Sequence, residues 1–409
     1  MPLNLFMKLQ RNKTMLVYTS ITKSYLPKAR VLAKSVKKFH PDWTFVLLYS
    51  DDLPVGFDLS AEPFDEVLTI ENLGIPDWKR WAFGHTVVEL CTAVKGTAAE
   101  VMAQRPNVDK VMYLDPDIKV FNSLTVLDEL LDKHEILLTP HLLDAESDVA
   151  SICDNELSAL KHGVYNLGFF AARTDGQGLG FIQWWANRLR LFCRDDIPAG
   201  IFTDQRWCDL APAFFSGLHI VRDRGCNVAT WNIAHRPLSK DDNGVFLVAG
   251  VPLRFYHFTG YDSGAGFGML TRYASSQAVA HELWDIYAKD IKAEGQGDTT
   301  LKSWFYGNFE NGESIPTKAR RLYQQRVDVQ KAFPFPYSME EPSYFSWWKA
   351  ETNSGLNQPV DGGVATLSIG RLVARSFISP NTARQNFKTV VRVIKRDGVV
   401  GFIKKVIAR

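Results

Sequence analysis

The sequence predicts an α/β fold built on a mostly parallel, Rossmann-like sheet. Short apolar segments alternate with helical patterns along the first half of the chain, which is the pattern of repeated strand–helix units. Two acidic residues directly follow one of these apolar segments. The chain has 409 residues, of which 46% are hydrophobic and 22% charged, enough for one large core or two smaller ones.

The first three predicted strands come early in the chain. Thr14–Ser20 is a short apolar run, and it is followed by helical spacing of apolar residues from Leu26 to Val36. Trp43–Tyr49 and Glu66–Ile70 are the second and third strands. Strands joined through helices run parallel, so these segments predict one sheet.

The fourth predicted strand carries the first chemical signal. A helix from about His85 to Gln104 precedes the strand Lys110–Leu114, which runs into Asp115-Pro116-Asp117. Loops at the carboxyl ends of parallel strands converge on a crevice, where ligands bind. Two carboxylates separated by one residue can reach one divalent cation, although a solvated acidic turn has the same sequence.

The rest of the chain divides by composition. Glu135–Thr139, Tyr165–Ala172 and Leu253–Phe258 are further predicted strands, and Phe181–Phe192 and Ala274–Ala293 are predicted helices. The expected parts are a catalytic domain over residues 1–265, a helical appendage over 266–350, a linker over 351–364 and a basic amphipathic tail over 365–409.

Charge and composition exclude several classes of function. A net charge of +2 gives no whole-protein field for nucleic acid, so none is expected as a partner. The five cysteines are widely spaced and form no C-x-x-C pair. The opening residues lack a secretory signal, and no apolar run reaches the roughly 18 residues of a membrane span. We therefore expect a cytoplasmic protein.

The tail is the exception to this balanced charge. Arg371–Arg409 contains ten Lys or Arg residues and one acid, Asp397. Its apolar residues recur at helical spacing, and basic amphipathic helices of this kind bind anionic membrane surfaces. We expect peripheral attachment to the inner face of a membrane, with docking of the tail on the protein's own core as the alternative.

Several short motifs, taken in order, resemble one enzyme family. Val111–Phe121 (VMYLDPDIKVF) is similar to the metal-binding strand of GT-A glycosyltransferases, and especially of glycosyltransferase family 8, which includes glycogenin and bacterial lipopolysaccharide galactosyl- and glucosyltransferases. Tyr18-Thr19-Ser20, with the later Tyr25-Leu26-Pro27-Lys28-Ala29, resembles its nucleotide-binding first strand and helix, and Asn166-Leu167-Gly168 resembles its sugar-site turn. Thr203-Asp204-Gln205 and His257-Phe258-Thr259-Gly260 resemble its Asp-Gln pair and its His-x-x-Gly segment. The resemblance covers roughly residues 14–265.

The resemblance implies roles for individual residues. Asp115, Asp117 and His257 would bind Mn²⁺ or Mg²⁺. The family's Lys-Pro-Trp is replaced here by Tyr261-Asp262-Ser263. Lys95 is the expected substitute for the missing lysine, and an ordinary exposed lysine is the alternative. For nucleotide binding, the resemblance implies Tyr18, Thr19, Lys95, Asp115 and Gly260. For sugar binding and catalysis, it implies Asn166, Asp204 and Gln205.

The resemblance thus implies a metal-dependent, retaining glycosyltransferase that uses a nucleotide-diphosphate sugar, first of all a UDP-sugar. Its acceptor would be a cell-surface polysaccharide or glycolipid. A sugar nucleotidyltransferase is the closest alternative, but it needs a glycine-rich phosphate loop, and residues 18–30 contain no glycine. A non-catalytic glycan-binding protein on the same fold is the other alternative, which the intact acids and His257 disfavour.

Overall fold

The computed structural model describes residues 14–298, 301 and 303–353. The expected tail, and all but the first residues of the expected linker, lie outside this part of the chain. The described residues form two compact units, one ending at Arg320 and the other beginning at Arg321. None of the helices found between residues 14 and 353 combines the length and the apolar character that a membrane crossing requires.

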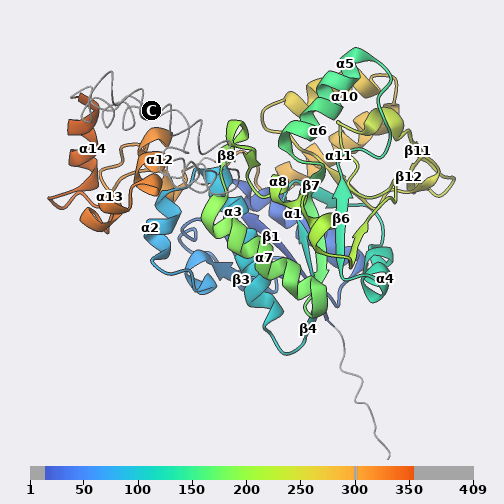
Figure 1. The fold of residues 1–409 in the computed structure, drawn as a ribbon. Coiled ribbons are helices and arrows are strands. Elements are labelled where there is room, and N and C mark those ends of the chain that lie inside the picture. The colour runs from blue at the N-terminus through green and yellow to red at the C-terminus, as the bar shows by residue number, and fades with distance from the viewer. Residues whose placement is uncertain (1–13, 299–300, 302, 354–409) are drawn as a thin grey trace, which may run out of the picture. The chain divides into compact units, whose positions relative to one another are not determined.

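The first unit is built on a mixed sheet of seven strands (Figure 1). Their order across the sheet is β10-β6-β7-β4-β1-β2-β3. Strand β7 runs antiparallel to its two neighbours, β6 and β4, and the other adjacent strands of this sheet are parallel. This arrangement confirms the expected α/β fold on a mostly parallel sheet. The strands are β1 (Thr14–Ile21), β2 (Thr44–Tyr49), β3 (Glu66–Thr69), β4 (Val108–Leu114), β6 (Ile136–Pro140), β7 (Tyr165–Arg173) and β10 (Leu218–Ile220).

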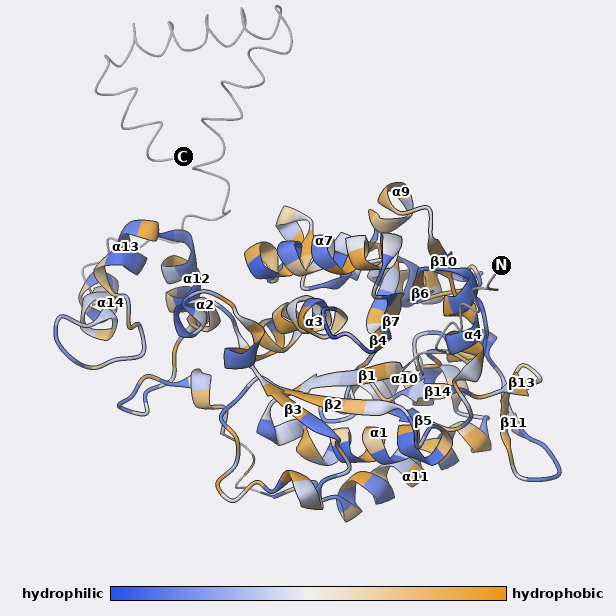
Figure 2. Ribbon diagram, turned by 90° about the horizontal axis from the view of Figure 1, so that it is seen from below, coloured by the Kyte–Doolittle hydropathy of each residue, from blue (hydrophilic) through white to orange (hydrophobic). Residues whose placement is uncertain are grey.

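Long helices cover both faces of this sheet (Figure 2). On one face lie α3 (Val87–Ala103) and α7 (Gly176–Phe192), and on the other lie α1 (Leu26–Phe39) and α11 (Ala278–Ala293). The two helices of the first face touch closely at Gly96, where an added Cβ would lie 2.7 Å from the Cα of Ala186. This contact fixes the position of the helix turn that carries Lys95.

Shorter elements fill the edges of the first unit. The strands β5 (Ile118–Val120) and β14 (Phe255–His257) form an antiparallel pair beside the sheet. The remaining elements are α2 (Trp78–Phe83), α4 (Thr125–Lys133), α5 (Val149–Ser151), a π-helical turn (Ile152–Glu156), α6 (Leu157–His162), β8 (Asp195–Asp196), β9 (Ile201–Phe202), α8 (Gln205–Cys208), α9 (Ala211–Phe214), β11 (Leu238–Lys240), β12 (Phe246–Val248), β13 (Val251–Pro252) and α10 (Ala265–Ala274).

The first unit continues past residue 265, where the sequence analysis places the end of the catalytic domain. Tyr256 and Phe258 share a buried core with Leu270 of α10 and with Trp284 and Tyr287 of α11. The helix predicted over Ala274–Ala293 begins at Ala278, after a turn that separates it from α10. Helix α12 (Thr317–Gln325) spans the boundary between the units, and α13 (Val327–Ala332) and α14 (Tyr344–Asn353) belong to the second.

Candidate active site

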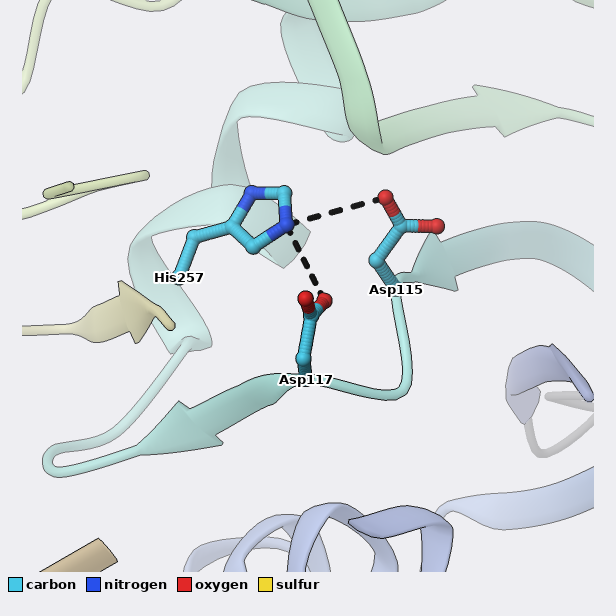
Figure 3. A group of neighbouring side chains, drawn as sticks. All are labelled: Asp115, Asp117 and His257. Carbon is cyan, nitrogen blue, oxygen red and sulfur yellow. Dashed lines mark ion pairs between the residues drawn. The ribbon is translucent and has the colours of Figure 1, made fainter. Parts of the chain in front are cut away.

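Asp115, Asp117 and His257 converge at the carboxyl edge of the sheet (Figure 3). The Nε2 atom of His257 lies 3.0 Å from Oδ1 of Asp117 and 3.7 Å from Oδ2 of Asp115. One ligand atom from each residue lies within 4.8 Å of the others. Two ligands of one divalent ion lie no more than roughly 5 Å apart, so these three side chains fit one cation.

The backbone around these residues explains their convergence. Asp115 follows β4, and its backbone N–H donates to the carbonyl of Gly168 in β7 at 2.8 Å. His257 pairs with Ile118 across the β5–β14 ladder, and Phe258 N–H donates to the carbonyl of Asp117 at 2.8 Å. Two segments that lie far apart in the sequence are therefore held together by main-chain bonds that do not depend on a bound cation.

The three side chains also influence one another electrostatically. Burial alone raises the pKa of Asp117, but the adjacent His257 outweighs it and holds that pKa below its ordinary value. Burial lowers the pKa of His257, and the carboxylates of Asp117 and Asp115 more than offset this, so the pKa is raised. The imidazole therefore occupies a strongly anionic position, which favours a cation.

Gly168 leaves the space that His257 fills. A Cβ built at Gly168 would lie 2.5 Å from Cε1 of His257 and 2.7 Å from Oδ1 of Asn166. Both side chains belong to the site, so a methyl group at this position would push the imidazole away from β7. Gly168 therefore leaves the room that the imidazole of His257 needs beside β7.

We expect Gly168→Ala to weaken Mn²⁺ binding at least tenfold and to destabilise the fold by about 1–3 kcal/mol, the usual range for overpacking. Gly268→Ala in α10 is the matched control, since its Cβ would meet nothing within 4 Å and alanine favours a helix. Calorimetric titration with Mn²⁺ and thermal unfolding measure both effects. Equal Mn²⁺ affinity in the two variants would contradict the role of Gly168.

Lys95 and Asp204 form a buried ion pair next to the metal cluster. Their side chains are 4% and 3% exposed, and Nζ of Lys95 lies 2.9 Å from Oδ2 of Asp204. The same ammonium donates to Oδ1 of Asp115 at 3.1 Å and to the carbonyl of Leu167 at 3.2 Å. Burial alone would lower the pKa of Lys95, but the two carboxylates keep it raised, so the lysine is charged. The alternative prediction, that Lys95 is an ordinary exposed lysine, is wrong.

Asn166 and Gln205 belong to one hydrogen-bond network. The Oε1 atom of Gln205 accepts from the backbone N–H of Leu167 at 3.1 Å and from Nδ2 of Asn166 at 3.3 Å. Oδ1 of Asn166 accepts from the N–H of Gly168 at 3.1 Å and from Nδ2 of Asn227 at 3.0 Å. These bonds leave both amides with a fixed orientation.

The backbone in front of Gln205 is strained. Thr203 has a φ of +43°, in the left-handed region that β-branched residues rarely adopt. Its hydroxyl donates to Oδ1 of Asp204 at 3.1 Å, and the short helix α8 begins at Gln205. Strain of this kind costs of order 1–3 kcal/mol and persists where surrounding contacts over-determine the conformation, often at functional sites.

These residues face one cavity of about 650 Å³, within the range of about 300–1,000 Å³ that small-molecule sites occupy. Seven of the sequence-predicted residues line it: Lys95, Asp115, Asp117, Asn166, Asp204, Gln205 and His257.

The structure does not bring Tyr18, Thr19 or Gly260 to this cavity. The side chains of Tyr18 and Thr19 are fully buried, and the hydroxyl of Tyr18 donates to the carbonyl of Lys95 at 2.8 Å. Ser20, Ile21 and Thr22 line the cavity from the end of β1 instead. Gly260 has a φ of +69° and contributes to the turn after His257.

Sequence reasoning missed the wall contributed by residues 141–162. His141, Asp154, Asn155 and Ser158 line the cavity, and the last three lie on or beside the π-helical turn. Burial lowers the pKa of His141 to about 4, so its neutral ring accepts from Nδ2 of Asn166. No motif marks these residues, although π-helical turns frequently occur at functional sites.

Two proteins of Bacillus subtilis strain 168 are related to this chain, and no family model matches it. The uncharacterized protein YfnD is 32% identical over 256 residues, which cover 59% of this chain and 76% of YfnD. The uncharacterized protein YfnF is 27% identical over 176 residues, which cover 42% of this chain. The chain spans 57% of the length of YfnF.

Solved structures of glycosyltransferases also resemble this chain. The galactosyltransferase LgtC, solved with donor and acceptor sugar analogs, has a TM-score of 0.39 and 18% identity, covering 67% of this chain and all of LgtC. GlyE of Streptococcus pneumoniae has a TM-score of 0.38 and 16% identity, covering 68% of this chain and 64% of GlyE. Mouse xyloside xylosyltransferase 1 has a TM-score of 0.35 and 14% identity, covering 60% of this chain and 98% of that protein.

Proposed function

This chain belongs to the same family as YfnD of Bacillus subtilis, and we propose that it is a metal-dependent glycosyltransferase using a nucleotide-diphosphate sugar. The observation that carries the proposal is the position of Asp115, Asp117 and His257 on the wall of a cavity that Asn166, Asp204 and Gln205 also line. A cation site and polar groups for sugar hydroxyls therefore face the same space. A UDP-sugar is the proposed donor.

Asp115, Asp117 and His257 would hold Mn²⁺ or Mg²⁺, which suit mixed carboxylate and imidazole ligation. When bound, the ion supplies positive charge where the leaving diphosphate gains negative charge. The chain's own residues keep this position ready, because the β5–β14 pairing sets the ligands and Gly168 leaves room for the imidazole.

The sugar would lie along the wall formed by Asn166, Asp204 and Gln205. A carboxylate has about four lone-pair positions, so Asp204 retains acceptor capacity beside its bonds to Lys95 and Thr203. The side chain of Gln205 would face the anomeric carbon. We propose retention of configuration, with the acceptor hydroxyl attacking from the side of the leaving group and passing its proton to the departing phosphate.

A thermal-shift screen with UDP- and GDP-sugars tests the donor class. A ligand that binds the folded state at 100 times its Kd stabilises the protein by about 2.7 kcal/mol, so a true donor raises the Tm by several degrees. We expect this shift with Mn²⁺ present and a small fraction of it with EDTA. Metal-independent shifts, or none with any sugar nucleotide, would contradict the proposal.

The proposed acceptor is a polysaccharide or a lipid-linked glycan at the inner face of the membrane. The basis is the sequence of residues 365–409, which lie outside the described part of the chain. Each Lys or Arg near an anionic surface contributes on the order of 1 kcal/mol to membrane binding. The full chain is expected to sediment with anionic vesicles at low salt and not with neutral ones. A chain truncated after Gly370 should remain in the supernatant with both, and its sedimentation would contradict the attachment.

A further inference from the structure

A second lysine lies buried close to the metal cluster. Lys28 is in the first turn of α1, and its side chain is 1% exposed. Its Nζ lies 2.5 Å from Oδ2 of Asp262, whose own side chain is 41% exposed. An ammonium group buried without a counter-charge is costly, so Asp262 offsets a charge that the fold would otherwise leave buried and unpaired.

This pair borders the cavity on the side of the metal ligands. The Nζ of Lys28 lies 4.1 Å from the ring centroid of Tyr25, which lines the cavity. Asp262 follows Thr259, another residue of the cavity wall, by three positions.

Asp262 can leave Lys28 without moving the chain around it. The ring of the preceding Tyr261 stacks on Trp284, with centroids 5.7 Å apart, and meets Tyr287 edge-on at 5.4 Å. The carboxylate also accepts a long hydrogen bond of 3.4 Å from Nε2 of Gln296 and a hydrogen bond from the hydroxyl of Tyr25. Because the neighbouring ring is anchored and the carboxylate is partly exposed, exchange of Asp262 requires the loss of its bonds to Lys28, Gln296 and Tyr25 but no movement of Tyr261.

The cavity wall offers little other positive charge for an anion. Among the described residues that line it, Lys95 carries the one ammonium, and no arginine is present. Lys95 is already engaged by Asp115 and Asp204. Lys28 lies behind this wall against the ring of Tyr25, and the carboxylate that pairs with it is partly exposed.

We propose that Lys28 binds the diphosphate of the donor, and that Asp262 occupies this anion position until the phosphate oxygens displace it. The inference rests on the proposed function and assigns its diphosphate contact to Lys28, where the sequence analysis expects Lys95. The exchange is one anion for another on the same ammonium. It predicts that Asp262 competes with diphosphate, and that this competition requires Lys28.

Calorimetric binding of pyrophosphate in saturating Mn²⁺ tests the exchange independently of the base and the sugar. Asp262→Asn removes the competing charge and should bind Mn²⁺-pyrophosphate about fivefold more tightly than the wild type. Lys28→Met removes the cation and should bind it roughly tenfold more weakly. Glu294→Gln is the matched control. Glu294 pairs at 2.5 Å with Lys34, which lies on α1 as Lys28 does, and Glu294 does not line this cavity.

The double variant Lys28→Met/Asp262→Asn separates competition from a general change in charge. If Asp262 acts by occupying Lys28, Asp262→Asn gives no tightening in the Lys28→Met background. Equal tightening in both backgrounds, or none in either, would overturn the exchange while leaving the proposed function intact. A wild type that binds Mn²⁺ but not its pyrophosphate complex would overturn both. Mn²⁺ titration of each variant shows that the metal cluster is folded.

Discussion

Asp117→Ala is expected to abolish donor turnover while leaving the fold intact. Asp117 is one of three side chains whose ligand atoms converge within 4.8 Å, and its carboxylate lies 3.0 Å from Nε2 of His257. Substituting a residue that only supports a metal ligand costs about 10–100-fold in metal affinity, so loss of a direct ligand should cost more. Nucleotide-sugar hydrolysis measured against Mn²⁺ concentration gives the affinity and the turnover separately.

His257→Ala should produce a milder form of the same defect, partly rescued by excess Mn²⁺, because both carboxylates remain. Asp242→Ala is the control, since Asp242 is an exposed acid in a turn and its loss should change stability by no more than about 0.5 kcal/mol. Near-normal turnover of Asp117→Ala at saturating Mn²⁺ would show that the residue does not hold a catalytic ion.

The strands of the sheet could be predicted because their signal is local. β1, β2 and β7 are buried along nearly their whole length, so each appears in the sequence as a continuous apolar run. The carboxyl edge was also predictable, because Asp115 and Asp117 directly follow such a run. The position of His257 came from the family resemblance, and the β5–β14 ladder supplies its physical reason.

The remainder depended on contacts that no local pattern encodes. Lys95 belongs to a helix whose spacing says nothing of Asp204, which lies more than a hundred positions later in the chain. The expected domain end at residue 265 was placed by composition, whereas α11 packs its aromatic residues on β14. In the same way, the motif containing Tyr18 pointed to the correct strand, but the side chains that reach the cavity come from the residues after it.

Lys95→Met is expected to destabilise the protein by about 3–5 kcal/mol, the cost of leaving a buried charge without its partner. The side chain of Asp204 is 3% exposed, and Lys95 is the cation that contacts it. Asp115 is less affected, since its side chain is 25% exposed. Denaturant unfolding measures the loss. Lys240→Met is the control, because Lys240 forms a surface pair with Glu282 that is worth no more than about 1 kcal/mol.

The destabilisation should depend on pH in a defined direction. Burial already raises the pKa of Asp204 in the wild type, and removal of Lys95 raises it further. A carboxyl group whose folded pKa lies above its unfolded pKa stabilises the fold below the unfolded value, and this stabilisation is lost as the pH rises through the folded pKa. The deficit of Lys95→Met relative to wild type should therefore shrink as the pH falls from neutral towards about 4, near the ordinary pKa of aspartate.

The double variant Lys95→Met/Asp204→Asn separates the structural role of the pair from its role in the reaction. Removing both charges eliminates the unpaired carboxylate, so most of the lost stability should return at neutral pH. Turnover should stay low, because the ammonium that contacts Asp115 and the carboxylate that lines the proposed sugar site are both gone. Recovery of turnover together with stability would show that the pair serves only the fold, and a stability loss equal to the sum of the single variants would show that the two charges do not interact.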